Sequence, residues 1–160
     1  MFKLGEMISY PMYGVGRIEA IEEKEIRGKV DTYYVLCFRS EGERVMLPVR
    51  RAEAANLRPL IDLETAREVL EFLGTDHNER EFANWNRRYR FHLDKLKSGD
   101  IFEVASVFKS LCVRKKSRGL SSGERVMFDS ARGFLTDELA AVFGRTSDET
   151  MERIMACIEQ

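Results

Sequence analysis

The chain has 160 residues, of which 44% are hydrophobic and 33% are charged, and this composition is typical of one folded domain or two small ones, not of a disordered protein. No apolar run reaches the ~18 residues that a membrane span needs, and the N-terminus lacks the apolar core of a signal peptide, so we expect a cytoplasmic protein. Three cysteines, Cys37, Cys112 and Cys157, lie far apart in the sequence and predict small core residues rather than a metal or redox site.

The first sixty residues predict a small antiparallel sheet. Strands with apolar runs or period-two alternation are expected at residues 7–11, 14–22, 33–38, 44–49 and 56–60. Turns are expected at residues 27–29 and 41–43, where glycine follows a charged residue. Four or five short strands in sixty residues are typical of an SH3- or Tudor-like barrel, which is too small to enclose a deep pocket.

Residues 61–160 predict a compact bundle of five helices. Helix starts are indicated by Asp62, by Asp100 with Glu103, by Ser121 with Glu124 and by Ser147. Residues 84–90 indicate the start of a further amphipathic helix. The predicted fold class is therefore α+β, with an N-terminal domain at residues 1–60, a helical domain at 61–160 and no long linker between them.

Positive charge is concentrated in one block around the only tryptophan. Residues 84–119 contain ten Lys or Arg and three Asp or Glu, a net charge of +7, whereas the whole chain has a net charge of −1. Such a block is often a solvated surface, but its contrast with the rest of the chain favours contact with a polyanion. The net charge near zero predicts few phosphate contacts and modest affinity.

Trp85 lies at the border between the apolar and basic faces of its predicted helix. On a helical wheel the buried stripe is formed by Phe82, Tyr89, Leu93 and Leu96, with Trp85 at its edge. One interpretation is that Trp85 completes the core stripe and the arginines cover it. The other is an aromatic wedge beside phosphate-binding cations, as in minor-groove proteins.

Further basic residues follow the Trp85 helix. They are Lys109 and the run at residues 114–118. Cations at a helix C-terminus also interact favourably with the helix dipole, so the run has two interpretations. If the two helices pack antiparallel, the run at residues 114–118 would extend the basic patch around Trp85.

We find no motif for catalysis, a cofactor or a metal. Gly14 and Gly16 introduce a strand rather than the helix of a dinucleotide fingerprint. His77 and His92, the only histidines, have no cysteine at zinc-ligand spacing. We therefore expect a binding protein with no metal, no cofactor and no enzymatic activity.

Four segments together resemble the CarD/CdnL family of bacterial transcription regulators over essentially the whole chain. They are residues 5–16 (GEMISYPMYGVG), 47–49 (LPV), 84–89 (NWNRRY) and 118–124 (RGLSSGE). The first sixty residues are also similar to the polymerase-interacting domain of transcription-repair coupling factor, a large ATP-driven translocase, but this chain has no ATPase motif.

The resemblance implies two binding sites. The barrel is expected to dock on the β subunit of RNA polymerase through Lys24, Arg44, Met46, Leu47 and Pro48. The helical domain is expected to bind promoter DNA at the upstream edge of the transcription bubble through Asn84, Trp85, Arg87, Arg88 and Arg90. Some relatives carry a basic residue at Met46 and an arginine at Lys24, so this polymerase contact is expected to be more apolar.

The function implied is stabilisation of the promoter open complex through largely sequence-independent minor-groove and backbone contacts. The resemblance also implies a protein that acts as a monomer and associates with the nucleoid through polymerase. The alternative is a protein-protein adaptor with a polymerase-binding barrel, a core tryptophan and no direct DNA contact.

Overall fold

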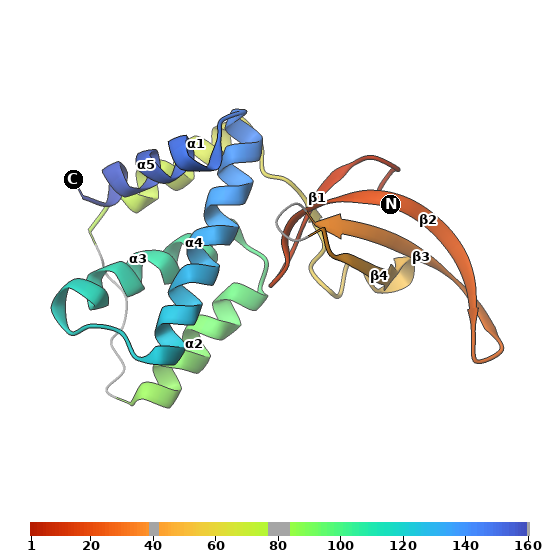
Figure 1. Ribbon diagram of the computed structural model, residues 1–160, viewed down its shortest axis with the longest axis horizontal. Helices are drawn as coiled ribbons and strands as arrows, with labels where there is room; N and C mark the ends of the chain where they lie inside the picture. The colour runs from red at the N-terminus through yellow and green to blue at the C-terminus, as the bar shows by residue number, and fades with distance from the viewer. Residues whose placement is uncertain (39–41, 77–83, 160) are drawn as a thin grey trace. The chain divides into compact units, whose positions relative to one another are not determined.

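The computed structural model describes residues 1–38, 42–76 and 84–159 (Figure 1). These residues form two compact units, Met1–Leu60 and Ile61–Gln160. The first is a five-stranded antiparallel sheet and the second is helical, so the predicted α+β fold class, with a small SH3/Tudor-like sheet before five helices, is confirmed. The expectations for Phe82, for Glu41 and for residues 77–79 fall outside the described residues.

The sheet unit is an antiparallel meander closed by a short strand. Its strands lie in the order β4-β3-β2-β1-β5. The elements are β1 (Met7–Tyr10), β2 (Gly14–Ile26), β3 (Lys29–Phe38), β4 (Arg44–Pro48), the 3-10 helix η1 (Val49–Arg51) and β5 (Arg58–Pro59). Alternating residues such as Ile18, Leu36 and Leu47 fill one core, because successive side chains of a strand point to opposite faces.

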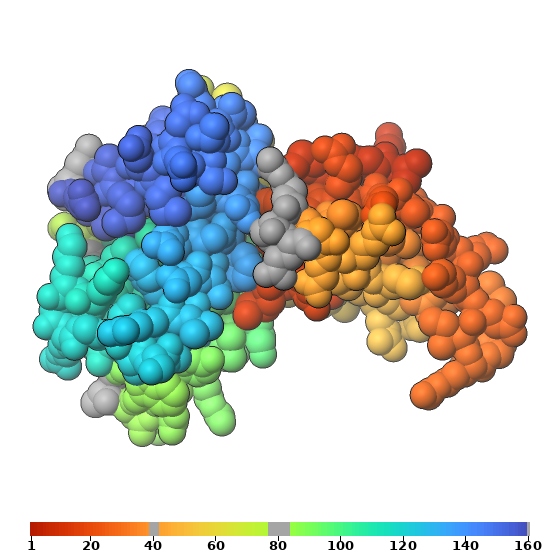
Figure 2. All heavy atoms as spheres, viewed as in Figure 1, coloured from red at the N-terminus to blue at the C-terminus, as the bar shows by residue number. Residues whose placement is uncertain are grey.

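The β2–β3 hairpin is longer than the sequence predicted. Its pairing continues to Ile26 opposite Lys29, and the connecting Arg27 and Gly28 have φ values of 53° and 78°. Two consecutive positive φ values match the type I′ turn, whose twist suits a two-residue hairpin. The alternation of buried residues ends before Glu22, so the outer half of the hairpin was not recognisable from periodicity. Figure 2 shows this end as a narrow extension of the sheet unit.

The helical unit has one core to which every described helix contributes. The helices are α1 (Leu63–Leu73), α2 (Trp85–Lys97), α3 (Ile101–Ser117), α4 (Ser122–Phe143) and α5 (Ser147–Ile158). Fully or almost fully buried side chains come from each of them in turn: Leu73, Leu96, Phe108, Leu135 and Ile154. In Figure 1 the long α4 lies beside α3 and α2, while α1 and α5 lie together.

The predicted N-caps Asp62, Asp100 and Ser121 are confirmed, and the predicted N-cap of the last helix is wrong. Asp62, Asn84, Asp100 and Ser121 each accept backbone hydrogen bonds at their helix start. Helix α5 is capped by Thr146 instead of Ser147, because Glu149 lies three residues after Thr146 and completes a capping box with it. Ser147 is the first helical residue.

We predict that Gly16→Ala destabilises the sheet unit. A Cβ at Gly16 would lie 2.7 Å from the Phe38 ring and 2.8 Å from the Cys37 carbonyl oxygen, so β2 and β3 must shift apart. Overpacking of this kind costs about 1–3 kcal/mol, which urea unfolding would measure. The control is Gly133→Ala in α4, where a Cβ meets nothing within 4 Å. It should stabilise its helix by roughly 0.5–1 kcal/mol, and equal effects of the two variants would contradict the argument.

Candidate nucleic-acid interface

Asn84 fixes the start of α2 and thereby the position of Trp85. The Asn84 Oδ1 atom accepts hydrogen bonds from the backbone N–H groups of Asn86 at 2.9 Å and Arg87 at 3.3 Å. Asparagine is favoured here because its side chain replaces the carbonyl partners that the first helical N–H groups lack. Its carbonyl oxygen is therefore occupied by the helix, and its role in DNA binding stays a prediction.

The Trp85 side chain lies on the rim of the helical unit. Its exposed fraction is 42%, so the interpretation that it completes the core is not supported. The indole stacks on Tyr89, with ring centroids 5.3 Å apart and planes 20° apart. Its Nε1 atom donates a 2.8 Å hydrogen bond to Ser121 Oγ, just before α4. The ring is thus held on one side and open to solvent on another.

A buried carboxylate lies directly behind this contact. Glu124 is 2% exposed, and its Oε2 atom accepts a 2.9 Å hydrogen bond from Arg88 Nε. Arg114 Nε lies 3.5 Å from the same oxygen, and Ser121 Oγ donates to Oε1 at 3.0 Å. Burial raises the pKa of the Glu124 carboxyl, but hydrogen bonds from Arg88 and Ser121 outweigh it and hold the pKa below its ordinary value. Glu124 is therefore ionised at neutral pH.

The predicted DNA-binding arginines differ in exposure, because among the described residues one of them is paired with Glu124 and the other two are not. Arg87 and Arg90 are exposed on α2 and available to a phosphate backbone. The Arg88 side chain is only 11% exposed and faces Glu124. The sequence could not distinguish them, because the partner of Arg88 is 36 residues away. Arg88 therefore contributes to the site by holding α2 to α4.

Lys109 is buried in the helical unit and is not part of an exposed basic surface. Lys109 is 6% exposed, and its Nζ donates to the carbonyl oxygen of Phe72 at 3.0 Å and to Thr75 Oγ1 at 2.7 Å. It therefore binds the C-terminal end of α1, where carbonyl groups lack helical partners. Burial lowers the pKa of Lys109.

The end of α3 does reach the Trp85 region, because Arg114 contacts Glu124 at the start of α4. Lys115 lies over the Phe128 ring at 4.9 Å, while Lys116 and Arg118 are exposed. Arg125, four residues after Ser121 and exposed, is a further cation that the sequence analysis did not select. No signal in the sequence pointed to it, because the start of α4 meets Trp85 only through the Trp85–Ser121 contact, which spans 36 positions.

The predicted polymerase-contact residues lie on or near the edge strand β4, except Lys24. Met46 is 38% exposed and Pro48 is half-buried, whereas Leu47 is 7% exposed and packs in the sheet core. Because side chains alternate along a strand, Leu47 supports β4 from the core side and Met46 faces outward. Arg44 is exposed and forms a 2.8 Å ion pair with Glu19. Lys24 lies on the outer half of β2, 3.8 Å from Glu22.

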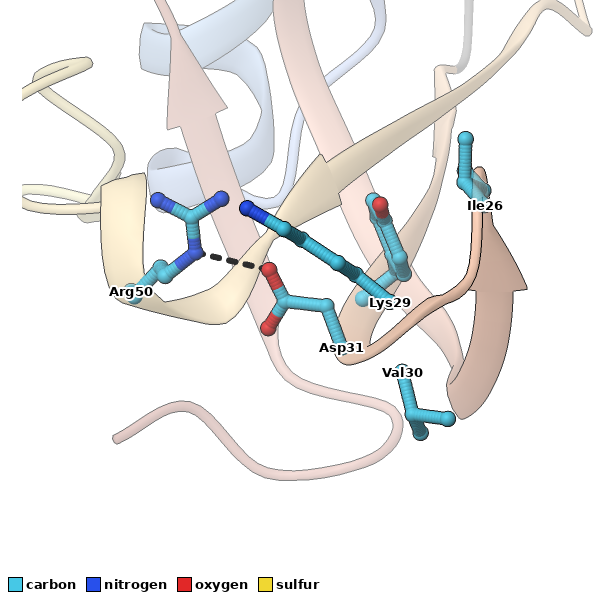
Figure 3. Close-up of a pocket in the computed structure, with 6 residues that line it drawn as sticks. Ile26, Lys29, Val30, Asp31 and Arg50 are labelled. Atoms are coloured by element: carbon cyan, nitrogen blue, oxygen red, sulfur yellow. Dashed lines mark hydrogen bonds and ion pairs between the residues drawn. The ribbon is translucent and has the colours of Figure 1, made fainter.

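A shallow hollow of about 510 Å³ lies between the outer hairpin and η1. Figure 3 shows its lining, with the Asp31–Arg50 ion pair at 2.7 Å and the apolar side chains of Ile26 and Val30 away from that pair. The hydrogen bond from Arg50 lowers the pKa of Asp31. Tyr33, also in the lining, pairs with Pro48 in the sheet register, so the hollow adjoins the end of β4.

Within the described residues there is no cluster of three potential metal ligands among His, Cys, Asp and Glu. The described cysteines are free thiols; Cys112 is buried, as predicted, while Cys37 and Cys157 are half-buried. Burial raises the pKa of the Cys112 thiol to about 11, so it is not a reactive thiolate. None of the described helices is both long enough and apolar enough to cross a bilayer.

One unit thus has an exposed sheet edge, and the other has an exposed indole on the same helix as the exposed Arg87 and Arg90. Residues 2–61 match the model of the CarD-like/TRCF RID domain, and residues 68–155 match that of the CarD C-terminal domain. The chain is 36% identical over 149 residues to the protein named "Putative transcription factor YdeB" of Bacillus subtilis (strain 168), covering 93% of this chain and 97% of that protein. The chain belongs to the CarD-like family of transcription factors.

Proposed function

We propose that this protein docks on the β subunit of RNA polymerase through its sheet unit and stabilises the promoter open complex with its helical unit. Trp85 is the proposed wedge at the upstream edge of the bubble, with Arg87 and Arg90 on the flanking phosphates. The observation that carries the proposal is the 42% exposed indole, held by Tyr89 and Ser121 beside two exposed arginines. Family membership supports it.

An indole is suited to a melted fork rather than to intact duplex. Inserting an apolar side chain between base pairs costs a few kcal/mol of unstacking, and a step that is already distorted has lost part of that stacking. Trp85 should therefore bind the open state more tightly than the closed state. A ligand shifts such an equilibrium only by its differential affinity, and ~1.4 kcal/mol changes it about tenfold.

Docking on polymerase explains how a site with few exposed cations can bind promoter DNA. Two exposed arginines and a chain net charge of −1 predict weak binding to free DNA. A tethered site acts at a high effective concentration, so a weak contact becomes occupied once the sheet unit is bound. The proposed action is therefore specific to polymerase-bound promoters without base-specific readout.

The proposed docking surface is the outer edge of β4 with the adjoining hollow. In the described sheet β4 pairs with β3 and ends the strand order on that side. An edge strand offers backbone groups to a strand of a partner, and outward side chains give selectivity. Met46, 38% exposed, is the apolar contact, and Arg44 is the flanking charge.

We predict that Met46→Glu weakens capture of the matching polymerase by tenfold or more, because a carboxylate would be desolvated at an apolar contact. Affinity is measured by pull-down or biolayer interferometry with purified core polymerase. The control is Leu4→Glu, which adds the same charge at a 67% exposed position before β1. Equal affinity of the two variants would show that β4 is not the docking edge.

A further inference from the structure

We infer that Ser121 is a positioning residue for Trp85, and that Glu124 with its two arginines fixes the orientation of the Ser121 hydroxyl. This inference rests on the proposed function of the indole, but its structural part can be tested without DNA. The inference gives Glu124, Arg88 and Arg114 a structural role, because these ion-paired residues are not exposed for contact with DNA.

The hydrogen-bonding capacity of Ser121 is fully used. A hydroxyl has one proton to donate and two lone pairs to accept with. Ser121 Oγ lies 3.0 Å from Glu124 Oε1, 2.8 Å from Trp85 Nε1 and 3.3 Å from the Glu124 backbone nitrogen. The indole and backbone N–H groups can only donate, and a carboxylate can only accept. The proton of Ser121 therefore points to Glu124, and its lone pairs face the indole and the helix start.

The charge of Glu124 makes this orientation unique. A neutral partner could itself donate a proton to the hydroxyl and allow the reverse arrangement. Arg88 donates to the carboxylate at 2.9 Å and keeps it ionised, and Arg114 lies 3.5 Å from the same oxygen, so Glu124 offers only acceptors to Ser121. The hydrogen bond from Arg88 is charge-assisted, and such bonds are shorter and stronger than neutral ones.

The same contacts connect the starts of two helices. Trp85 begins α2 and Ser121 precedes α4, so the Nε1 hydrogen bond spans 36 positions of the sequence. Tyr89 stacks on the indole ring. Gly123, at the start of α4, lies so near the ring that a Cβ added there would touch Trp85 Cζ2 at 3.4 Å. The indole is therefore oriented before DNA arrives, and less side-chain entropy is lost when it binds.

The test compares Ser121→Ala with Thr146→Ala. Both variants remove the cap of a capping box, but only Ser121 contacts the indole. Trp85 is the only tryptophan, so its fluorescence reports the site alone. We expect Ser121→Ala to lower the fluorescence anisotropy and increase acrylamide quenching. Thr146→Ala should leave both at their wild-type values, and Ser121→Thr, which keeps the hydroxyl, should restore them.

Open-complex lifetime is measured on the same variants. Ser121→Ala should reduce the stabilising effect about fivefold, equivalent to the ~1 kcal/mol of one net hydrogen bond. If the indole signals of Ser121→Ala equal those of Thr146→Ala, the positioning role is overturned. If Ser121→Ala loosens the indole but Trp85→Ala has no effect on the lifetime, the positioning role stands and the proposed function fails.

Discussion

Trp85→Ala is expected to shorten the lifetime of the promoter open complex about tenfold relative to the wild-type protein. The reason is the loss of an apolar ring at the fork, since stacking of an aromatic side chain on a base contributes ~1–3 kcal/mol. The lifetime is measured with the matching polymerase after adding a competitor that traps dissociated enzyme. Trp85→Phe should retain part of the effect because it keeps an apolar aromatic ring, although this ring is smaller and lacks the Nε1 donor.

The control for this variant is Leu63→Ala. Leu63 at the start of α1 is 43% exposed, close to the 42% of Trp85, so both variants remove a similarly exposed apolar side chain. Leu63→Ala should leave the open-complex lifetime unchanged. If Trp85→Ala is folded by circular dichroism, binds polymerase normally and still gives the wild-type lifetime, the wedge mechanism is wrong.

Glu124→Ala is expected to produce the largest loss of stability among the variants considered. Removing one member of a buried ion pair leaves the other charge without compensation and costs about 3 kcal/mol or more. Arg88, with 11% of its side chain exposed, would be left facing an apolar methyl group. Urea unfolding monitored by the Trp85 fluorescence would report this loss directly.

Glu124 is both the ion-pair partner of Arg88 and part of the capping box of α4, and two further variants distinguish these two contributions to stability. Glu149 holds the equivalent position in the capping box of α5 but is exposed, so Glu149→Ala should lower stability much less. Replacing both partners, by Arg88→Met with Glu124→Met, should recover part of the loss because the closest buried ion pair becomes apolar. A loss in Glu124→Ala no greater than that in Glu149→Ala would contradict the burial argument.

Much of this architecture could be predicted because its signals are local. Apolar or aromatic runs and the period-two alternation of residues 14–22 identified the strands, and capping residues with glycine stops identified the helices to within a few positions. The outer hairpin was missed because its residues are exposed on both faces, so pairing there has no hydrophobic periodicity. The start of α5 was misassigned by one residue because Thr146 and Ser147 are both suitable caps, and only the partner Glu149 distinguishes them.

The sequence by itself determined that a tryptophan lies at the edge of an amphipathic helix within a basic block, since helical periodicity and charge are properties of neighbouring residues. Only the tertiary structure decided which cations remain available. Arg88 and Lys109 are engaged by partners 36 and 37 residues away, whereas Arg87 and Arg90 remain exposed. The physical reason is that a buried charge is stable only beside its partner, and that partner is brought near by the packing of other helices.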